Sequence, residues 1–198
     1  MDTESLWIQT QRIVCGQLGV HFDADLQHQL IGHPASHIGP MLAERAGTDP
    51  DDAIKQLLDV NELLVRESAR PMPGAGELVE AMGAKVPLAV ASNSARRILD
   101  VALGRSTFEA GFAATVSAEQ VARPKPAPDV YLAAAEALGL DARKCLAFED
   151  SEAGAKAAVA AGMAVIAVPQ AASQRPIAHA FCGSLASGEL LAWVAAWE

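Results

Sequence analysis

Residues 144–162 of the chain read KCLAFEDSEAGAKAAVAAG, and this stretch decides which fold class the sequence can adopt. It begins with a short apolar run, passes through the acidic pair Glu149–Asp150 and continues into an alanine-rich segment of helical composition. A second apolar run, MAVIAVP at 163–169, follows directly. Strand, helix and strand in this order predict a β-α-β unit, whose two strands lie parallel in one sheet.

The same alternation extends over residues 71–198. Strands are predicted at 86–92, 112–118, 144–150 and 163–169, with a weak one at 180–186, and helices at 77–85, 94–104, 128–139 and 153–162. Continuous apolar runs of this kind are typical of parallel strands that are buried on both faces. The sequence therefore predicts an α/β fold with a Rossmann-like parallel sheet flanked by helices.

Residues 6–68 have a different texture. Their apolar residues recur at helical spacing, and no strand-like run interrupts them. Within this part, Asp49 is expected at an N-cap and Pro50 in the first turn of a helix. The turn-rich RPMPGAGE at 70–77 then separates this helical domain from the α/β part.

Charge and cysteine usage limit the function classes. The net charge is −9, from 15 Lys and Arg against 24 Asp and Glu, with a pI near 5.0, which argues against a nucleic-acid partner. No apolar run approaches the about 20 residues that a membrane span needs. Three scattered cysteines without C-x-x-C spacing fit a reducing compartment. We expect a cytoplasmic protein that binds neither nucleic acid nor membranes.

Polar residues follow the predicted strands at their carboxyl ends, which is where ligands of open parallel sheets bind. Ser92 ends one strand, and Asn93 leads into a helix, so a hydroxyl and helix-start amides could hold an anion. The alternative is that Ser92 only caps the helix. Lys125, between two prolines in RPKPAPD, is a positioned charge suited to a phosphate or carboxylate, or else a solvated loop lysine.

The acidic pair Glu149–Asp150 stands at the end of a buried strand. Carboxylates there are costly unless cations accompany them, and Mg²⁺ together with Lys125 would be suitable partners. The alternative is that the pair stabilises the start of the following helix. A hydroxyl, a lysine and an acidic pair at successive strand ends are what phosphoryl transfer requires.

These segments resemble motifs of the haloacid dehalogenase (HAD) superfamily of aspartate-nucleophile hydrolases. ASNS at 91–94, RPKPAPDVYLAAAEALG at 123–139 and CLAFEDSEAGAKAAVAAGM at 145–163 are similar to its second, third and fourth motifs, and MPGAGELVEAM at 72–82 to the turn and helix that enter its core. The resemblance implies a helical cap domain at 6–68, inserted into a core formed by 1–5 and 69–198.

The resemblance also implies site residues. Ser92, Asn93 and Lys125 would bind phosphate, with Ser92 and Lys125 acting as catalytic residues. Asp150 and Glu149 would bind Mg²⁺. DTESLW at 2–7 is similar to the tail of the first motif.

The strand that carries the family's nucleophilic aspartate and its acid/base aspartate has no counterpart in the 198 residues. Our leading hypothesis is that the chain's start is assigned one strand too late. The alternative is a genuine truncation, which would leave a catalytically dead homologue that acts as a binding module. Without that central strand, we expect the chain to be poorly soluble or loosely folded.

ESLWIQTQ at 4–11 is more similar to the family's sugar-phosphate phosphatases than to its phosphomutases. The resemblance therefore implies Mg²⁺-dependent hydrolysis of a small phosphorylated metabolite, such as a sugar phosphate, through an aspartyl-phosphate whose nucleophile lies upstream of this chain. β-Phosphoglucomutase and phosphoglycolate phosphatase activities remain alternatives. The protein would be a monomer or a homodimer.

A loop in the helical domain is the candidate for substrate selection. The resemblance implies that Gly32, His33 and Ser36 belong to a cap loop that reaches the active site. The histidines in this segment, His28, His33 and His37, do not predict a zinc site. Gly32, Pro34, Gly39 and Pro40 interrupt any single helix face that could align these histidines.

Overall fold

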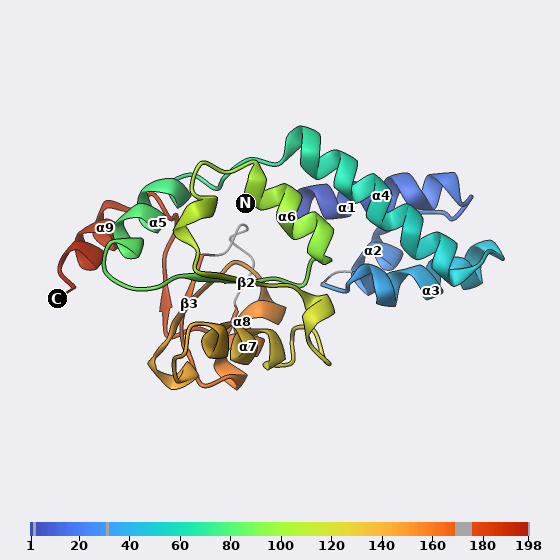
Figure 1. The fold of residues 1–198 in the computed structure, drawn as a ribbon. Helices are drawn as coiled ribbons and strands as arrows, with labels where there is room; N and C mark the ends of the chain where they lie inside the picture. Colours follow the sequence, from blue (N-terminus) through green and yellow to red (C-terminus); the bar gives the residue numbers. More distant parts are fainter. Residues whose placement is uncertain (2, 31, 169–175, 198) are drawn as a thin grey trace. The chain divides into compact units, whose positions relative to one another are not determined.

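The computed structural model describes residues 1, 3–30, 32–168 and 176–197. Asp2, in the segment that resembles the tail of the first motif, lies outside the described residues. The chain divides into two compact units, coloured along the sequence in Figure 1. The first unit contains Met1–Arg70 and Arg97–Arg105, and the second contains Pro71–Arg96 and Ser106–Glu198.

Helices build the first unit. They are α1 (Glu4–Gln17), α2 (Ala24–Leu30), α3 (Ala35–Ala46), α4 (Pro50–Ser68) and, after its first residue, α6 (Arg96–Gly104). The long helix α4 packs along both α1 and α3 (Figure 1). Leu30, Ile38, Leu42 and Leu57 are fully buried at the centre of this packing. The helical pattern of 6–68 thus reflects a core formed by the apolar faces of several short helices.

Helix α3 differs from the sequence prediction. We expected Gly39 and Pro40 to interrupt a helix, but α3 runs through both. Gly39 is buried, and a Cβ at this position would collide with Ile54 of α4, so the missing side chain allows the two helices to approach closely. Pro40 has no N–H to donate to the carbonyl of Ser36, four residues earlier in the helix. Both residues are exposed, so water can satisfy that carbonyl.

The start of α4 confirms the predicted cap. The Oδ1 of Asp49 accepts hydrogen bonds from the backbone amides of Asp51 and Asp52, at 2.8 and 3.4 Å. Pro50 occupies the first helical position, where its missing N–H costs no hydrogen bond.

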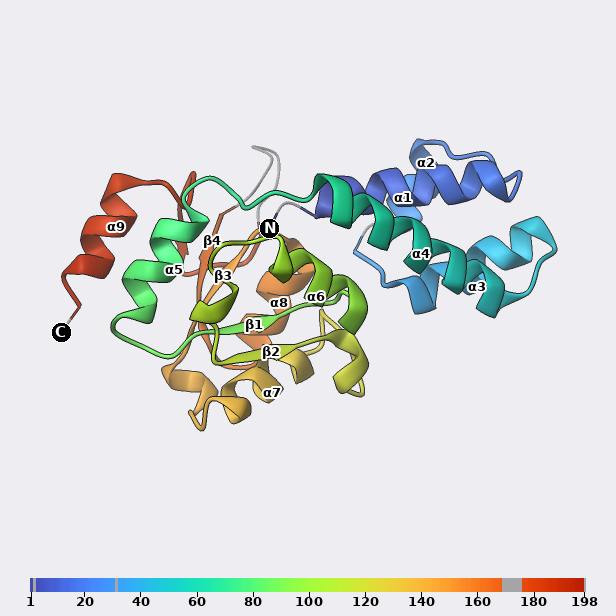
Figure 2. The ribbon, with the colours of Figure 1, turned by 45° about the horizontal axis from the view of Figure 1, so that its top comes forward.

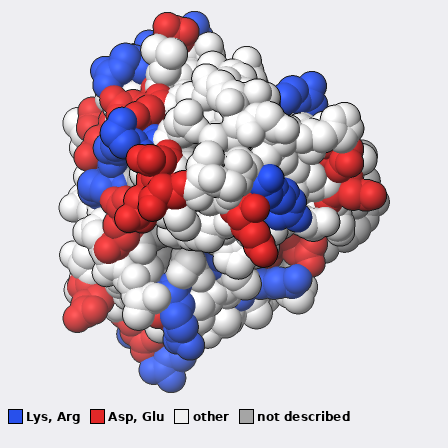
Figure 3. Space-filling model, turned by 90° about the vertical axis from the view of Figure 1, so that its right-hand side faces the viewer, with Lys and Arg blue, Asp and Glu red and all other residues white. Residues whose placement is uncertain are grey.

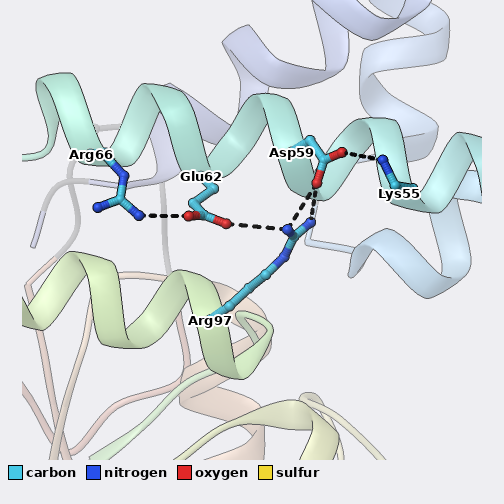
Figure 4. Close-up of polar contacts among 5 residues, drawn as sticks. All are labelled: Lys55, Asp59, Glu62, Arg66 and Arg97. Atoms are coloured by element: carbon cyan, nitrogen blue, oxygen red, sulfur yellow. Dashed lines mark hydrogen bonds and ion pairs between the residues drawn. The ribbon is translucent and has the colours of Figure 1, made fainter.

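An ion-pair network joins α4 to α6 (Figure 4). Arg97 of α6 lies 2.9 Å from Asp59 and 3.2 Å from Glu62, and each of these carboxylates also pairs with a cation of α4 itself, Lys55 or Arg66. The five side chains are between 27% and 74% exposed. Exposed pairs contribute little individually, so the network orients α6 on α4 rather than carrying the stability of the unit.

The second unit alternates strands and helices, as predicted. Its elements are α5 (Ala75–Gly83), β1 (Ala89–Ala91), η1 (Glu109–Gly111), β2 (Ala114–Val116), η2 (Ala118–Gln120), α7 (Asp129–Ala137), η3 (Ala142–Lys144), β3 (Leu146–Glu149), α8 (Glu152–Ala160), β4 (Ala164–Ala167), β5 (Ala180–Phe181) and α9 (Gly188–Ala195). Every predicted strand, including the weak last one, contains one of these strands. The predicted α/β class with parallel pairing is confirmed.

The strands form two separate parallel ladders, which can be followed in Figure 2. In one, β1 pairs with β2, and in the other β3 pairs with β4, which pairs with β5. Within the described part of the chain, no ladder connects β1 to β3. One apolar cluster nevertheless spans both, because α7 and α8 contribute Val130 and Ala155 to the same core as Val116 of β2 and Val165 of β4.

No helix within the described ranges has the length and apolar character to cross a membrane. Figure 3 shows acidic and basic side chains next to each other at several places on one face, with an area without charged residues between them.

Candidate active site

Ser92 and Asn93 lie immediately after β1. The backbone amide of Ser92 donates to the Val116 carbonyl at 2.9 Å, which holds the end of β1 against β2. The Oγ of Ser92 accepts a hydrogen bond from the Ser94 amide at 3.1 Å, so the hydroxyl shapes the turn. The amide of Arg96, where α6 begins, donates to the carboxylate of Glu119 at 2.9 Å. An anionic side chain of the protein therefore occupies this helix start.

The Asn93 side chain joins this turn to the proline-rich segment 124–128 that carries Lys125, which we call the connector. Its Oδ1 accepts from the backbone amide of Lys125 at 2.8 Å, and its Nδ2 donates to the backbone carbonyl of Lys125 at 3.1 Å. The two residues are 32 positions apart in sequence. The predicted phosphate-binding residues of the second and third motifs are thus in direct contact.

The Lys125 side chain forms a buried ion pair with Glu149 at the end of β3. The Nζ lies 2.5 Å from Oε1 of Glu149, and the two side chains are only 10% and 5% exposed. The hydroxyl of Tyr131, in α7, donates to the same oxygen, and the lysine ammonium also lies 4.8 Å from the centre of the tyrosine ring. The lysine is therefore not a solvated loop residue.

Burial and charge act in opposite directions on the Glu149 carboxyl. Burial alone would raise its pKa, but the Lys125 ammonium and the hydrogen bonds from Lys125, Tyr131 and Ser151 bring the pKa below its ordinary value. Glu149 is therefore a carboxylate at neutral pH. Burial, followed by the negative charges of Glu149 and Asp150, raises the pKa of Tyr131 well above its ordinary value, so the phenol remains a donor.

The start of α8 closes around the other oxygen of Glu149. Its Oε2 accepts from the hydroxyl of Ser151 at 3.0 Å, and Ser151 in turn caps α8 by accepting from the Gly154 amide at 3.1 Å. A Cβ on Gly154 would collide with the Glu149 carboxylate. The glycine of the helix start therefore provides the space that the buried carboxylate occupies.

Asp150 is half-buried beside this pair. Its charge contributes to the raised pKa of Tyr131, which indicates that it lies near the same cluster. The described residues contain no group of three histidine, cysteine, aspartate or glutamate side chains with the spacing of a metal site.

Three of the predicted site residues, Asn93, Lys125 and Glu149, form one hydrogen-bonded group in the second unit, and Ser92 directly precedes Asn93 in the chain. Sequence reasoning missed Tyr131. A polar aromatic residue in the first turns of the helix after the lysine was the available signal.

The predicted specificity residues Gly32, His33 and Ser36 belong to the first unit, where all three are exposed. The His33 carbonyl accepts from the indole N–H of Trp7 at 3.2 Å, and its ring stacks on His37 with centroids 4.2 Å apart. Partial burial, and then the neighbouring His37, lower the pKa of His33. Their predicted contact with substrate stays a prediction.

Comparison with known proteins places this geometry in a family context. A family model for haloacid dehalogenase-like hydrolases matches residues 1–168. Fructose-1-phosphate phosphatase YqaB of Escherichia coli is 30% identical over 170 residues, which cover 85% of this chain and 90% of that protein. Protein CbbY of Cupriavidus necator is 35% identical over 187 residues, covering 85% of this chain and 73% of that protein.

A solved structure has the same fold. The crystal structure of CbbY from Rhodobacter sphaeroides in complex with phosphate superposes with a TM-score of 0.82 at 22% identity, covering 93% of this chain and 89% of that one.

Proposed function

Because this chain belongs to the haloacid dehalogenase-like hydrolase family, we propose that it is the larger part of a Mg²⁺-dependent phosphatase for a small phosphorylated carbohydrate. The observation that carries the proposal is the buried Lys125–Glu149 pair, which Asn93 ties to the turn after β1. A held cation beside a hydroxyl suits a phosphoryl group, whose charge must be met by positioned donors. Relatives that act on sugar phosphates support this substrate class.

The chain's own residues would divide the work of holding the phosphoryl group. The Ser92 hydroxyl and the Lys125 ammonium would donate to phosphate oxygens, and the predicted donor at Asn93 would be its backbone amide. Glu149 keeps Lys125 in place, because it is a carboxylate at neutral pH and lies 2.5 Å from the ammonium. Tyr131 remains protonated and shields the pair from water.

The residues fit Mg²⁺ with Asp150 as the main protein ligand. Mg²⁺ commonly uses one or two carboxylates and completes its shell with water and phosphate oxygens. Glu149, the other predicted ligand, already accepts hydrogen bonds at both oxygens, so we assign it to the lysine. When bound, the ion would neutralise charge on the phosphoryl group.

The nucleophilic aspartate would come from a strand encoded upstream of Met1, as the family resemblance implies. The two unconnected ladders support this proposal, since a strand between β1 and β3 would join them into one sheet. Its carboxyl end would emerge beside Ser92 and Glu149, which follow β1 and end β3. Gly32, His33 and Ser36 would contact the sugar, and the protein would work in the cytoplasm as a monomer or homodimer.

The test is to express the chain together with the codons that precede Met1 in its gene. We expect Mg²⁺-dependent phosphate release from a panel of sugar phosphates, lowered by about two orders of magnitude in Asp150→Asn. Glu152→Gln, two residues further along, is the matched control and should leave activity unchanged. Upstream codons that encode no strand ending in aspartates, or an extended chain that binds phosphate without releasing it, would contradict the proposal and favour a binding module.

A further inference from the structure

The connector that carries Lys125 has few backbone donors of its own. Pro124, Pro126 and Pro128 have no N–H, so within 124–128 only Lys125 and Ala127 can donate, apart from side chains. The Ala127 amide donates to the Pro124 carbonyl at 3.0 Å and closes a tight turn around Lys125. The amide of Lys125 is therefore satisfied from outside the connector.

Asn93 satisfies both backbone polar groups of Lys125 with one side chain. A carboxamide offers a donor and an acceptor side by side, like the peptide group of a neighbouring strand. The distances of 2.8 Å to the amide and 3.1 Å to the carbonyl show that both bonds form. The side chain thus replaces a β-bridge in a segment whose prolines cannot extend a ladder.

Lys125 is consequently fixed at both ends. Asn93 holds its backbone, and Glu149 and Tyr131 hold its ammonium group. We propose that Asn93 is a positioning residue: its carboxamide clamps Lys125 to the turn after β1 and so sets the spacing between the Ser92 hydroxyl and the lysine ammonium before any phosphate binds. The purpose of that spacing rests on the proposed function, whereas the clamp itself does not.

The proposal distinguishes asparagine from its closest isostere. Asp in place of Asn93 could still accept from the Lys125 amide, but it would lose the bond to the Lys125 carbonyl and place a negative oxygen against it. Asn93→Asp should therefore release the lysine although its shape is unchanged, and Asn93→Ala should do so as well. Ser94→Ala is the matched control, because it keeps the backbone amide that bonds Ser92.

The experiment measures how fast each lysine is acetylated by a small anhydride, by mass spectrometry and without substrate. The other four lysines, Lys55, Lys85, Lys144 and Lys156, are exposed or largely so and serve as internal references. We expect Lys125 to react slowest, and about three- to tenfold faster in both Asn93 variants, because a lost hydrogen bond shifts local opening by about that factor.

An unchanged Lys125 rate in both variants would overturn the clamp, as would an equal rise at Lys144 and Lys156, which would mean general loosening. Repeating the measurement with inorganic phosphate and Mg²⁺ separates the two proposals. Phosphate should slow Lys125 acetylation further in the unmodified chain. If it does not, the proposed function fails while the clamp stands.

Discussion

Breaking the Lys125–Glu149 pair should be among the most destabilising single changes in the second unit. Glu149→Leu would remove the partner of a lysine side chain that is only 10% exposed, and would also leave the Tyr131 hydroxyl without its acceptor. Removing one member of a buried ion pair costs about 3–5 kcal/mol, a large share of the roughly 5–15 kcal/mol that stabilises a domain. Lys125→Met should cost less, about 1–3 kcal/mol, because the hydrogen bonds from Tyr131 and Ser151 to Glu149 remain.

The double variant decides whether the pair is coupled. Lys125→Met combined with Glu149→Leu removes both charges and leaves mainly one unsatisfied hydroxyl. The double variant should therefore lower the free energy of unfolding by no more than about 1–3 kcal/mol. At the middle of these ranges the cycle yields a coupling free energy of about 4 kcal/mol, above the roughly 0.5–3 kcal/mol that is usual for neighbouring residues. Urea unfolding followed by circular dichroism measures all four proteins.

The exposed pair Lys55–Asp59 is the matched control. It has the same chemistry at 2.9 Å, but its side chains are 74% and 45% exposed, so its coupling should stay below about 1 kcal/mol. If the buried pair shows no more coupling than this surface pair, water screens it and our account of the site is wrong.

Acid provides a second check of the same pair. The pKa of Glu149 lies below its ordinary value of 4.5, so its contribution to stability is complete above that value and is lost as the pH falls through the lowered pKa of the folded protein. The stabilities of the unmodified protein and of Glu149→Leu should therefore converge only below pH 4.5. Convergence already near neutral pH would show that the carboxyl is protonated there.

Three further results are expected. Tyr131 is the chain's only tyrosine, and its pKa is raised well above 10.0. Tyrosinate absorbance should therefore appear only when the protein unfolds at alkaline pH. A titration of Tyr131 near pH 10 in the folded protein would exclude the buried hydrogen bond. Gly154→Ala should destabilise the protein by displacing Glu149, whereas Gly16→Ala, with open space around its added methyl, should be neutral or stabilise by up to about 1 kcal/mol in thermal melts. Arg97→Ala should cost about 1 kcal/mol or less, and 1 M salt should remove most of that difference; a larger, salt-independent loss would mean that packing and not charge joins α6 to α4.

The elements that the sequence predicted share a local cause. The apolar run that ends at Glu149 and the alanine-rich helix after it are specified by residues adjacent in the chain, as is the Asp49 cap. Helix α3 was missed because its continuity depends on a contact with Ile54, which no local pattern reveals. Glycine and proline disfavour a helix locally, and tertiary packing reversed that preference.

The same distinction applies to the site. The sequence identified Ser92, Lys125 and Glu149 as polar residues at strand ends, and the structure brings Lys125 and Glu149 into contact. The sequence could not show that the Asn93 side chain bonds the backbone of Lys125, 32 residues away, since the prolines that create the need for this bond lie in another segment. It also could not separate the roles of Glu149 and Asp150, because adjacent carboxylates differ only in what surrounds them after folding.

The polar cluster has a structural consequence beyond its chemistry. The described ladders β1–β2 and β3–β4–β5 are not paired with each other, and among the described residues the apolar core under α7 and α8 and the chain of contacts from Asn93 through Lys125 to Glu149 both connect them. The core contact is non-directional, whereas the polar link fixes the strand ends by specific geometry. Residues that would grip a phosphoryl group are therefore also those that align the two ladders, and a change at Lys125 should disturb both at once.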